Sequence, residues 1–90
     1  MAKKNVIVKS ELRKTLPEVA SFLRELADKV EAGQVTLVQA GQDVSVELPD
    51  SVDFELEYYE QAKKSGLKKQ LEIELEWVEG GKKHQSVTLG

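Results

Sequence analysis

Carboxylates that alternate with apolar residues are the side chains of this sequence best placed to act together. Asp or Glu fills every second position in residues 53–57 and again in residues 72–76. Successive side chains of a strand point to opposite faces, so each segment would place its carboxylates on one side. If the two segments pair with Val52 opposite Trp77, every carboxylate of one strand lies directly across from a carboxylate of the other.

This predicted acidic face gains two further members at its margins. Pairing of Leu48 with Val52 would bring Glu47 beside Asp53, and Tyr59 would lie near the margin of the same face. The candidate interaction surface consists of Glu47, Asp53, Glu55, Glu57, Tyr59, Glu72, Glu74 and Glu76. Like charges directly opposite destabilise a sheet, by about 0.2–1 kcal/mol per pair. A cation or a basic partner would relieve that repulsion, whereas the alternative interpretation is a solvated face that only resists aggregation.

We expect the acidic face to bind a basic protein or peptide, with no metal, no cofactor and no catalysis. Calcium sites draw their oxygen ligands from a looping backbone rather than from a flat strand ladder. An enzyme needs a nucleophile with a base, or an acid and a base in different environments, and carboxylates on an open face provide neither. The sequence has no cysteine and a single histidine, His84, so a set of nitrogen or sulfur metal ligands is excluded.

Two other candidate sites have simpler structural interpretations. Trp77 shares strand parity with the aliphatic residues of 71–75, which predicts a core aromatic residue rather than a binding contact. The lysine-rich stretch of residues 63–69 surrounds Gly66 but lacks the strand, glycine-rich loop and helix of a phosphate site. We therefore expect a charged loop in this stretch.

The element expected to cover the sheet is a helix over residues 16–32. Thr15 and Glu18 have the spacing of a capping box, and Pro17 is tolerated in the first turn because its missing N–H is not needed there. Gly33 stands where a left-handed residue commonly ends a helix. Between these ends, apolar residues recur at helical spacing. They are Val19, Phe22, Leu23, Leu26, Ala27 and Val30.

Alternation of apolar and polar residues predicts the strands. It occurs in residues 5–12, 35–38, 44–48, 52–58 and 71–77. The predicted fold class is α+β in the order β-α-β-β-β-β, with one amphipathic helix packed on one face of a mainly antiparallel sheet of about five strands. We expect residues 1–90 to form a single domain with an ordered core over about residues 5–78. Residues 79–90 would add a turn and either a short strand or a frayed tail.

Charge and hydropathy bound the environment and the partners. The 90 residues carry a formal net charge of −3, and a net acidic surface disfavours binding to nucleic acid or to anionic lipid. The apolar runs are far shorter than the roughly 20 residues of a membrane span, and none has the length of a secretory signal. We therefore expect a cytoplasmic protein with neither a nucleic-acid nor a membrane partner.

Several segments together resemble the amphi-Trp domain, a family of small prokaryotic proteins. They are LEIELEW at residues 71–77, FLRELAD at residues 22–28, Gly33, and the strand of residues 44–48 with Pro49 and Asp50 after it. The likeness covers about residues 10–78 and implies the α+β fold and a prokaryotic origin, but no catalytic residue. The expected function is thus a small non-catalytic interaction module. The alternative is a self-associating homodimeric structural protein, and a small enzyme is the least favoured.

Overall fold

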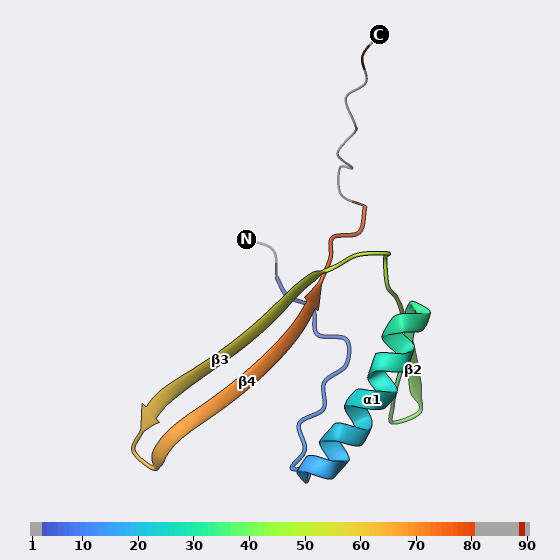
Figure 1. Cartoon of the computed structure of the whole chain (residues 1–90). Coiled ribbons are helices and arrows are strands. Elements are labelled where there is room, and N and C mark those ends of the chain that lie inside the picture. The colour runs from blue at the N-terminus through green and yellow to red at the C-terminus, as the bar shows by residue number, and fades with distance from the viewer. Residues whose placement is uncertain (1–2, 81–88, 90) are drawn as a thin grey trace. The chain divides into compact units, whose positions relative to one another are not determined.

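The computed structural model describes residues 3–80 and 89, which form one helix and four strands in two compact units, residues 1–51 and 52–90 (Figure 1). The first unit contains helix α1 (Leu16–Ala32), strand β1 (Gln34–Gln39) and strand β2 (Gln42–Glu47). The second unit contains strands β3 (Asp53–Lys63) and β4 (Gly66–Glu76). The α+β class is confirmed, and all of the strand pairing is antiparallel.

Helix α1 has the predicted bounds because both of its ends are fixed locally. At its start, the Glu18 backbone N–H donates to Thr15 Oγ1 at 3.4 Å, and the Thr15 N–H donates to Glu18 Oε1 at 3.0 Å. This reciprocal pair satisfies donors that have no partner inside the helix. At its end, Gly33 takes a left-handed conformation with φ of 85°, and its N–H donates to the Val30 carbonyl oxygen at 3.0 Å.

Strands β1 and β2 form a hairpin whose apolar side chains share one face. Val35 lies opposite Val46 and Leu37 opposite Val44, so the alternation of both strands is in phase. The turn residues Ala40 and Gly41 both have positive φ, which suits a two-residue hairpin loop. Helix α1 packs against β1.

Strands β3 and β4 form a longer hairpin than the sequence predicted. Each has 11 residues, and their pairing runs from Asp53 opposite Glu76 to Lys63 opposite Gly66. The lysine-rich stretch is therefore mostly strand, and the prediction of a loop there was wrong. The pairing of Glu60 with Lys69 joins opposite charges across the ladder, so the charged residues extend the hairpin instead of ending it.

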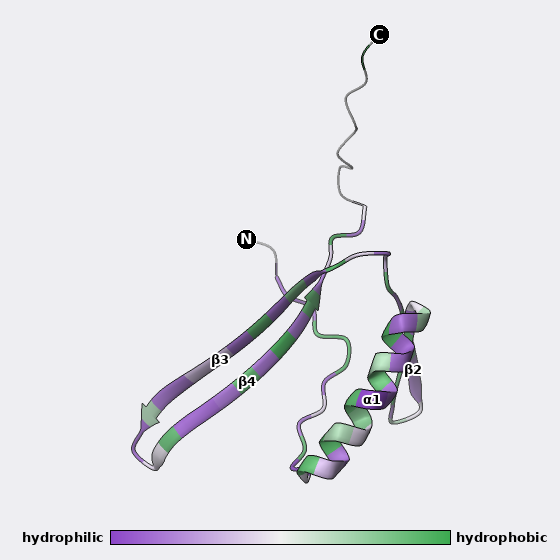
Figure 2. Ribbon diagram, in the orientation of Figure 1, coloured by the Kyte–Doolittle hydropathy of each residue, from purple (hydrophilic) through white to green (hydrophobic). Residues whose placement is uncertain are grey.

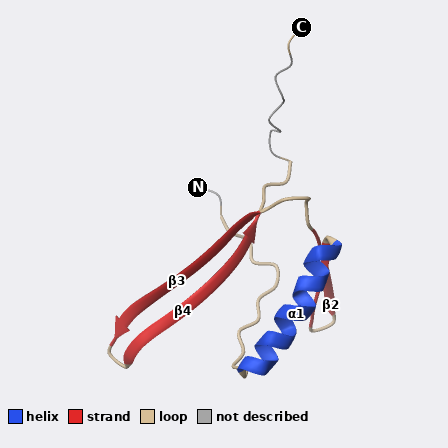
Figure 3. Cartoon of the chain, in the orientation of Figure 1, coloured by secondary structure: helices blue, strands red, loops and turns tan. Residues whose placement is uncertain are grey.

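The first predicted strand and the single large sheet are not present in the described residues. Residues 3–15 form no helix or strand (Figure 3), and β1 with β2 and β3 with β4 make two separate two-stranded sheets. Residues 5–12 alternate correctly for a strand but form no ladder, and the Gln39 side chain donates to the Lys9 carbonyl at 2.8 Å instead. Of the predicted tail at residues 79–90, residues 81–88 and 90 lie outside the described part.

The apolar stripe of α1 covers less than the sequence predicted. No side chain among the described residues is fully buried, and Leu26, Val30 and Val35 are half-buried. A two-stranded sheet offers a helix only a narrow surface, so much of the stripe stays in contact with water. Phe22, for example, remains 58% exposed.

Replacing the capping residue tests how far α1 depends on its first turn. We expect Thr15→Ala to lower the free energy of unfolding by about 0.5–2 kcal/mol in urea titrations, because the helix loses its side-chain acceptor. Ser21→Ala, at an exposed position within α1, is the matched control and should cause no such loss. Equal stability of the Thr15→Ala variant and the native protein would contradict the role given to this cap.

The same variant should change how stability depends on pH. Hydrogen bonds from the Thr15 backbone and side chain, with a smaller effect of Lys14, lower the pKa of Glu18 in the folded protein. A carboxyl whose pKa is lowered by folding stabilises the protein at pH values above its pKa in the unfolded chain. That stability is lost as the pH falls through the pKa of the carboxyl in the folded protein. In Thr15→Ala the backbone N–H of residue 15 can still donate to the Glu18 carboxylate. NMR titration of the carboxyl should therefore show the pKa of Glu18 rising only part of the way to its ordinary value.

Candidate functional site

The hairpin of β3 and β4 brings six carboxylates together on one strand face. Asp53 lies opposite Glu76, Glu55 opposite Glu74, and Glu57 opposite Glu72. This is the register predicted from placing Val52 opposite Trp77. Figure 2 shows the alternation of hydrophilic and hydrophobic residues along both strands. We call these six residues of the hairpin, without Glu47, the acidic face.

The opposite row of the hairpin explains why this register forms. Its cross-strand pairs are apolar: Phe54 with Leu75, Leu56 with Ile73, and Tyr58 with Leu71. A slip of one residue would place aliphatic side chains across from carboxylates and break both rows at once. The apolar pairs therefore hold the carboxylates opposite one another despite their repulsion.

A polar network continues the acidic face toward the hairpin turn. The Tyr59 hydroxyl donates to Gln70 Oε1 at 2.6 Å, and Gln70 Nε2 donates in turn to Glu72 Oε1. The Lys68 ammonium lies 6.0 Å from the centroid of the Tyr59 ring. Tyr59, Gln70 and Glu72 are half-buried, whereas the other five carboxylates of the face are exposed. Glu72 is therefore the one carboxylate of the face whose orientation is fixed by a neighbouring side chain.

Gln70 and Lys68 were missed by the sequence analysis. Both share strand parity with Glu72, Glu74 and Glu76, so continued alternation was the available signal. The density of lysines around Gly66 favoured the prediction of a loop, so the continued alternation was not recognised. The Tyr59 hydroxyl is part of the polar network that continues the acidic face.

Glu47 belongs to the first unit. It ends β2, where it lies opposite Gln34 and accepts a hydrogen bond from Gln34 Nε2 at 3.4 Å. Within the first unit, β2 forms its ladder with β1. The Leu48 N–H donates to the Gly33 carbonyl oxygen at 2.8 Å, which ties the end of β2 to the end of α1.

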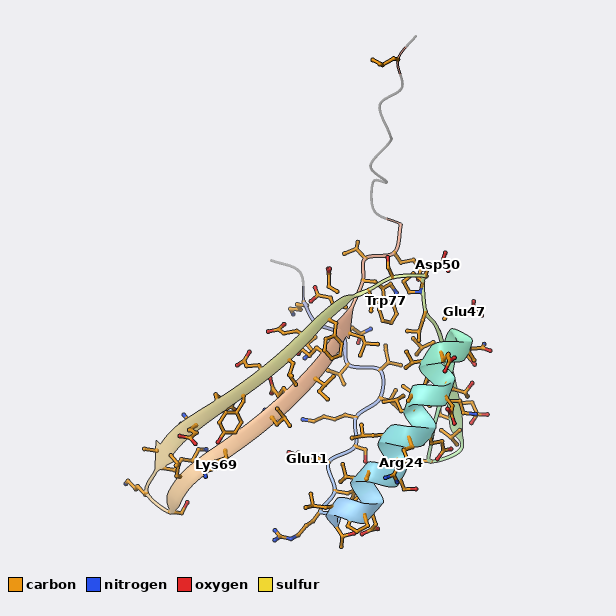
Figure 4. The ribbon with its side chains drawn as sticks, in the orientation of Figure 1. Glu11, Arg24, Glu47, Asp50, Lys69 and Trp77 are labelled. Atoms are coloured by element: carbon orange, nitrogen blue, oxygen red, sulfur yellow. The ribbon has the colours of Figure 1, made fainter. Side chains whose placement is uncertain are left out.

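Tyr58 and Trp77 have the strand parity of the apolar row of the hairpin. Trp77 follows β4 directly and is half-buried (Figure 4). The Tyr58 hydroxyl donates to Glu60 Oε2 at 2.7 Å, and this bond raises the pKa of Tyr58. His84 lies outside the described residues.

The acidic face can attract positive charge but offers no enclosed site. Among the described residues no group of three or more acidic, histidine or cysteine side chains is arranged to hold a metal ion. Two grooves of the first unit include none of the face residues. No described helix is long and apolar enough to cross a membrane.

Comparison with known proteins identifies the family of this chain. A family model described as the Amphi-Trp domain matches residues 1–90. The chain belongs to the Amphi-Trp domain family. The match covers the whole chain and so extends beyond the resemblance at residues 10–78. No curated protein and no solved structure matches the chain. Within this Amphi-Trp domain, the segment LEIELEW supplies the last three carboxylates of the acidic face.

Removing one carboxylate from an opposed pair should stabilise the hairpin. Glu74 lies across from Glu55, so we expect Glu74→Gln to raise the free energy of unfolding by about 0.2–1 kcal/mol. Added NaCl should raise the melting temperature of the native protein more than that of the variant, because salt screens the repulsion that the variant has lost. The control is Glu31→Gln at an exposed position of α1. A less stable Glu74→Gln protein would contradict this account.

Proposed function

We propose that this protein is a non-catalytic interaction module whose acidic face binds a basic segment of another protein. The observation that carries the proposal is the set of three directly opposed carboxylate pairs on β3 and β4. Each pair costs stability in the free protein. A partner that places a cation between the two strands would remove that cost on binding.

The spacing of the face suits an extended peptide. Residues two apart in a strand are about 6.6–6.8 Å apart, so the carboxylates form two parallel rows with that repeat. An extended partner with Lys or Arg at every second position has the same repeat. Such complementarity speeds association and favours the correct partner more than it adds affinity.

The same geometry argues against other ligands. A flat face cannot surround a divalent cation with six or more oxygens, so Ca²⁺ and Mg²⁺ should act only as salt. Nucleic acid would meet carboxylates where it needs cations. The proposed module needs no cofactor.

A basic peptide tests the acidic face directly. We expect an acetylated Lys-Thr heptapeptide with lysine at alternate positions to shift the amide resonances of Glu55, Glu57, Glu72 and Glu74 in 15N NMR spectra, whereas the matching Glu-Thr peptide should not. The double variant Glu55→Gln/Glu74→Gln should bind at least about fivefold more weakly, since it loses both members of one pair. The control is Asp28→Asn/Glu31→Gln on α1. Shifts that MgCl2 reproduces in full, or equal affinity of both double variants, would reject the proposal.

Self-association is the second candidate, favoured by the exposure of the apolar row. Phe54 is 65% exposed, Leu56 60% and Ile73 50%. Two copies that joined these rows would leave both acidic faces outward. Light scattering between low and high micromolar concentration separates the candidates. We expect a monomer throughout, and a concentration-independent dimer that Leu56→Gln dissociates would favour the structural role instead.

A further inference from the structure

A groove in the first unit has no role in the proposed function. It has a volume of about 530 Å³ and lies between residues 8–14, α1 and β1. We call it the β1 groove. Its size is within the range of protein ligand sites, roughly 300–1,000 Å³. None of its lining residues belongs to the acidic face.

One wall of the β1 groove is the edge of a strand. Residues 35–39 all line it, although successive side chains of a strand point to opposite faces. A groove that meets five consecutive residues runs along the backbone edge and not over one face. Within the described residues β1 pairs only with β2, so this outer edge carries no ladder. Within the first unit, its backbone donors and acceptors are therefore open to another strand.

The chain segment beside this edge does not occupy it as a strand. Residues 8–14 lie along the groove, and the hydrogen bond from Gln39 Nε2 to the Lys9 carbonyl joins a side chain to the backbone. No ladder forms between this segment and β1. The side chain of Gln39 thus holds the segment near β1 while the edge stays open.

Helix α1 supplies an apolar wall opposite the strand edge. Val19, Phe22 and Leu26 line the groove, and Val19 remains 38% exposed. Val8 and Leu12 add apolar side chains from the N-terminal segment. An occupant with aliphatic side chains on one side would bury them here.

The charged residues that line the β1 groove select the sign of charge of the occupant. Lys9, Lys14 and Lys29 line it, against the single carboxylate of Glu25. An occupant that carries carboxylates would complement this excess of positive charge. A neutral or basic peptide would lack that attraction.

We propose that the β1 groove binds an extended acidic segment of a partner protein, in which aliphatic residues alternate with Asp or Glu. The segment adds a strand to the outer edge of β1, its aliphatic side chains contact α1, and its carboxylates are attracted by the excess of positive charge that the three lysines give the groove. Main-chain hydrogen bonds supply affinity and the alternate side chains supply specificity, as in other cases of strand addition. This site is independent of the acidic face because the ligand charge is opposite and the residues lie in the other unit.

Peptide binding to the whole protein tests this inference. The probe is a fluorescein-labelled heptapeptide that alternates glutamate and valine, measured by fluorescence anisotropy. We expect it to bind, and we expect neither the lysine-valine peptide nor the Glu-Val peptide N-methylated at alternate residues to bind the groove. N-methylation keeps charge and side chains but removes the donors of one strand edge. In 15N NMR spectra the resonances of residues 35–39 should shift, and alternate amides of β1 should exchange with solvent more slowly.

Charge reversal provides matched variants. Lys9→Glu/Lys29→Glu should weaken binding of the Glu-Val peptide about tenfold, because both exposed lysines lie on the groove. Lys63→Glu/Lys64→Glu makes the same charge change at the hairpin turn of the other unit and should change affinity less than about twofold. Equal loss in both variants, undiminished binding of the N-methylated peptide, or shifts confined to β3 and β4 would overturn the inference. So would a ladder between residues 5–12 and β1 in the free protein, seen as cross-strand NOEs.

Discussion

The fixed pairing of two antiparallel strands is the constraint on which the rest of this structure depends. In β3 and β4 the apolar residues and the carboxylates occupy separate rows of one ladder, and each row exists only if the other does. Aliphatic pairs such as Leu56 with Ile73 favour the register, while pairs such as Glu55 with Glu74 oppose it. The backbone ladder and the apolar pairs together act against the repulsion between the opposed carboxylates.

The first unit also contains a hairpin in which the apolar residues of two paired strands share one face. Its hairpin presents four aliphatic side chains on one face, and these line grooves beside α1 and the N-terminal segment. The Gly33 carbonyl links this helix to the end of β2 through the Leu48 N–H. A short sheet with one covered face leaves strand edges and part of the apolar stripe of α1 exposed. A partner could therefore be recognised through backbone groups as well as through side chains.

Sequence reasoning succeeded where the determinants are local or repeated. The bounds of α1 follow from Thr15, Glu18 and Gly33, and the hairpin register follows from two rows that must match over several residues. Sequence reasoning failed where it had to specify which strands pair with each other. Residues 5–12 alternate like a strand, yet alternation does not specify which strand they pair with.

The extension of the hairpin past Tyr59 separates charge along its length. Carboxylates fill the paired positions near Asp53 and Glu76, whereas lysines gather around the turn, with Lys69 labelled near it in Figure 4. The 11 residues of each strand hold the two ends of the hairpin about 33 Å apart. The hairpin is therefore an electric dipole directed along its strands, acidic at one end and basic at the other. In dilute salt this dipole would turn an approaching charged molecule before contact. At physiological ionic strength, where screening acts over about 8 Å, each end presents its own sign of charge independently.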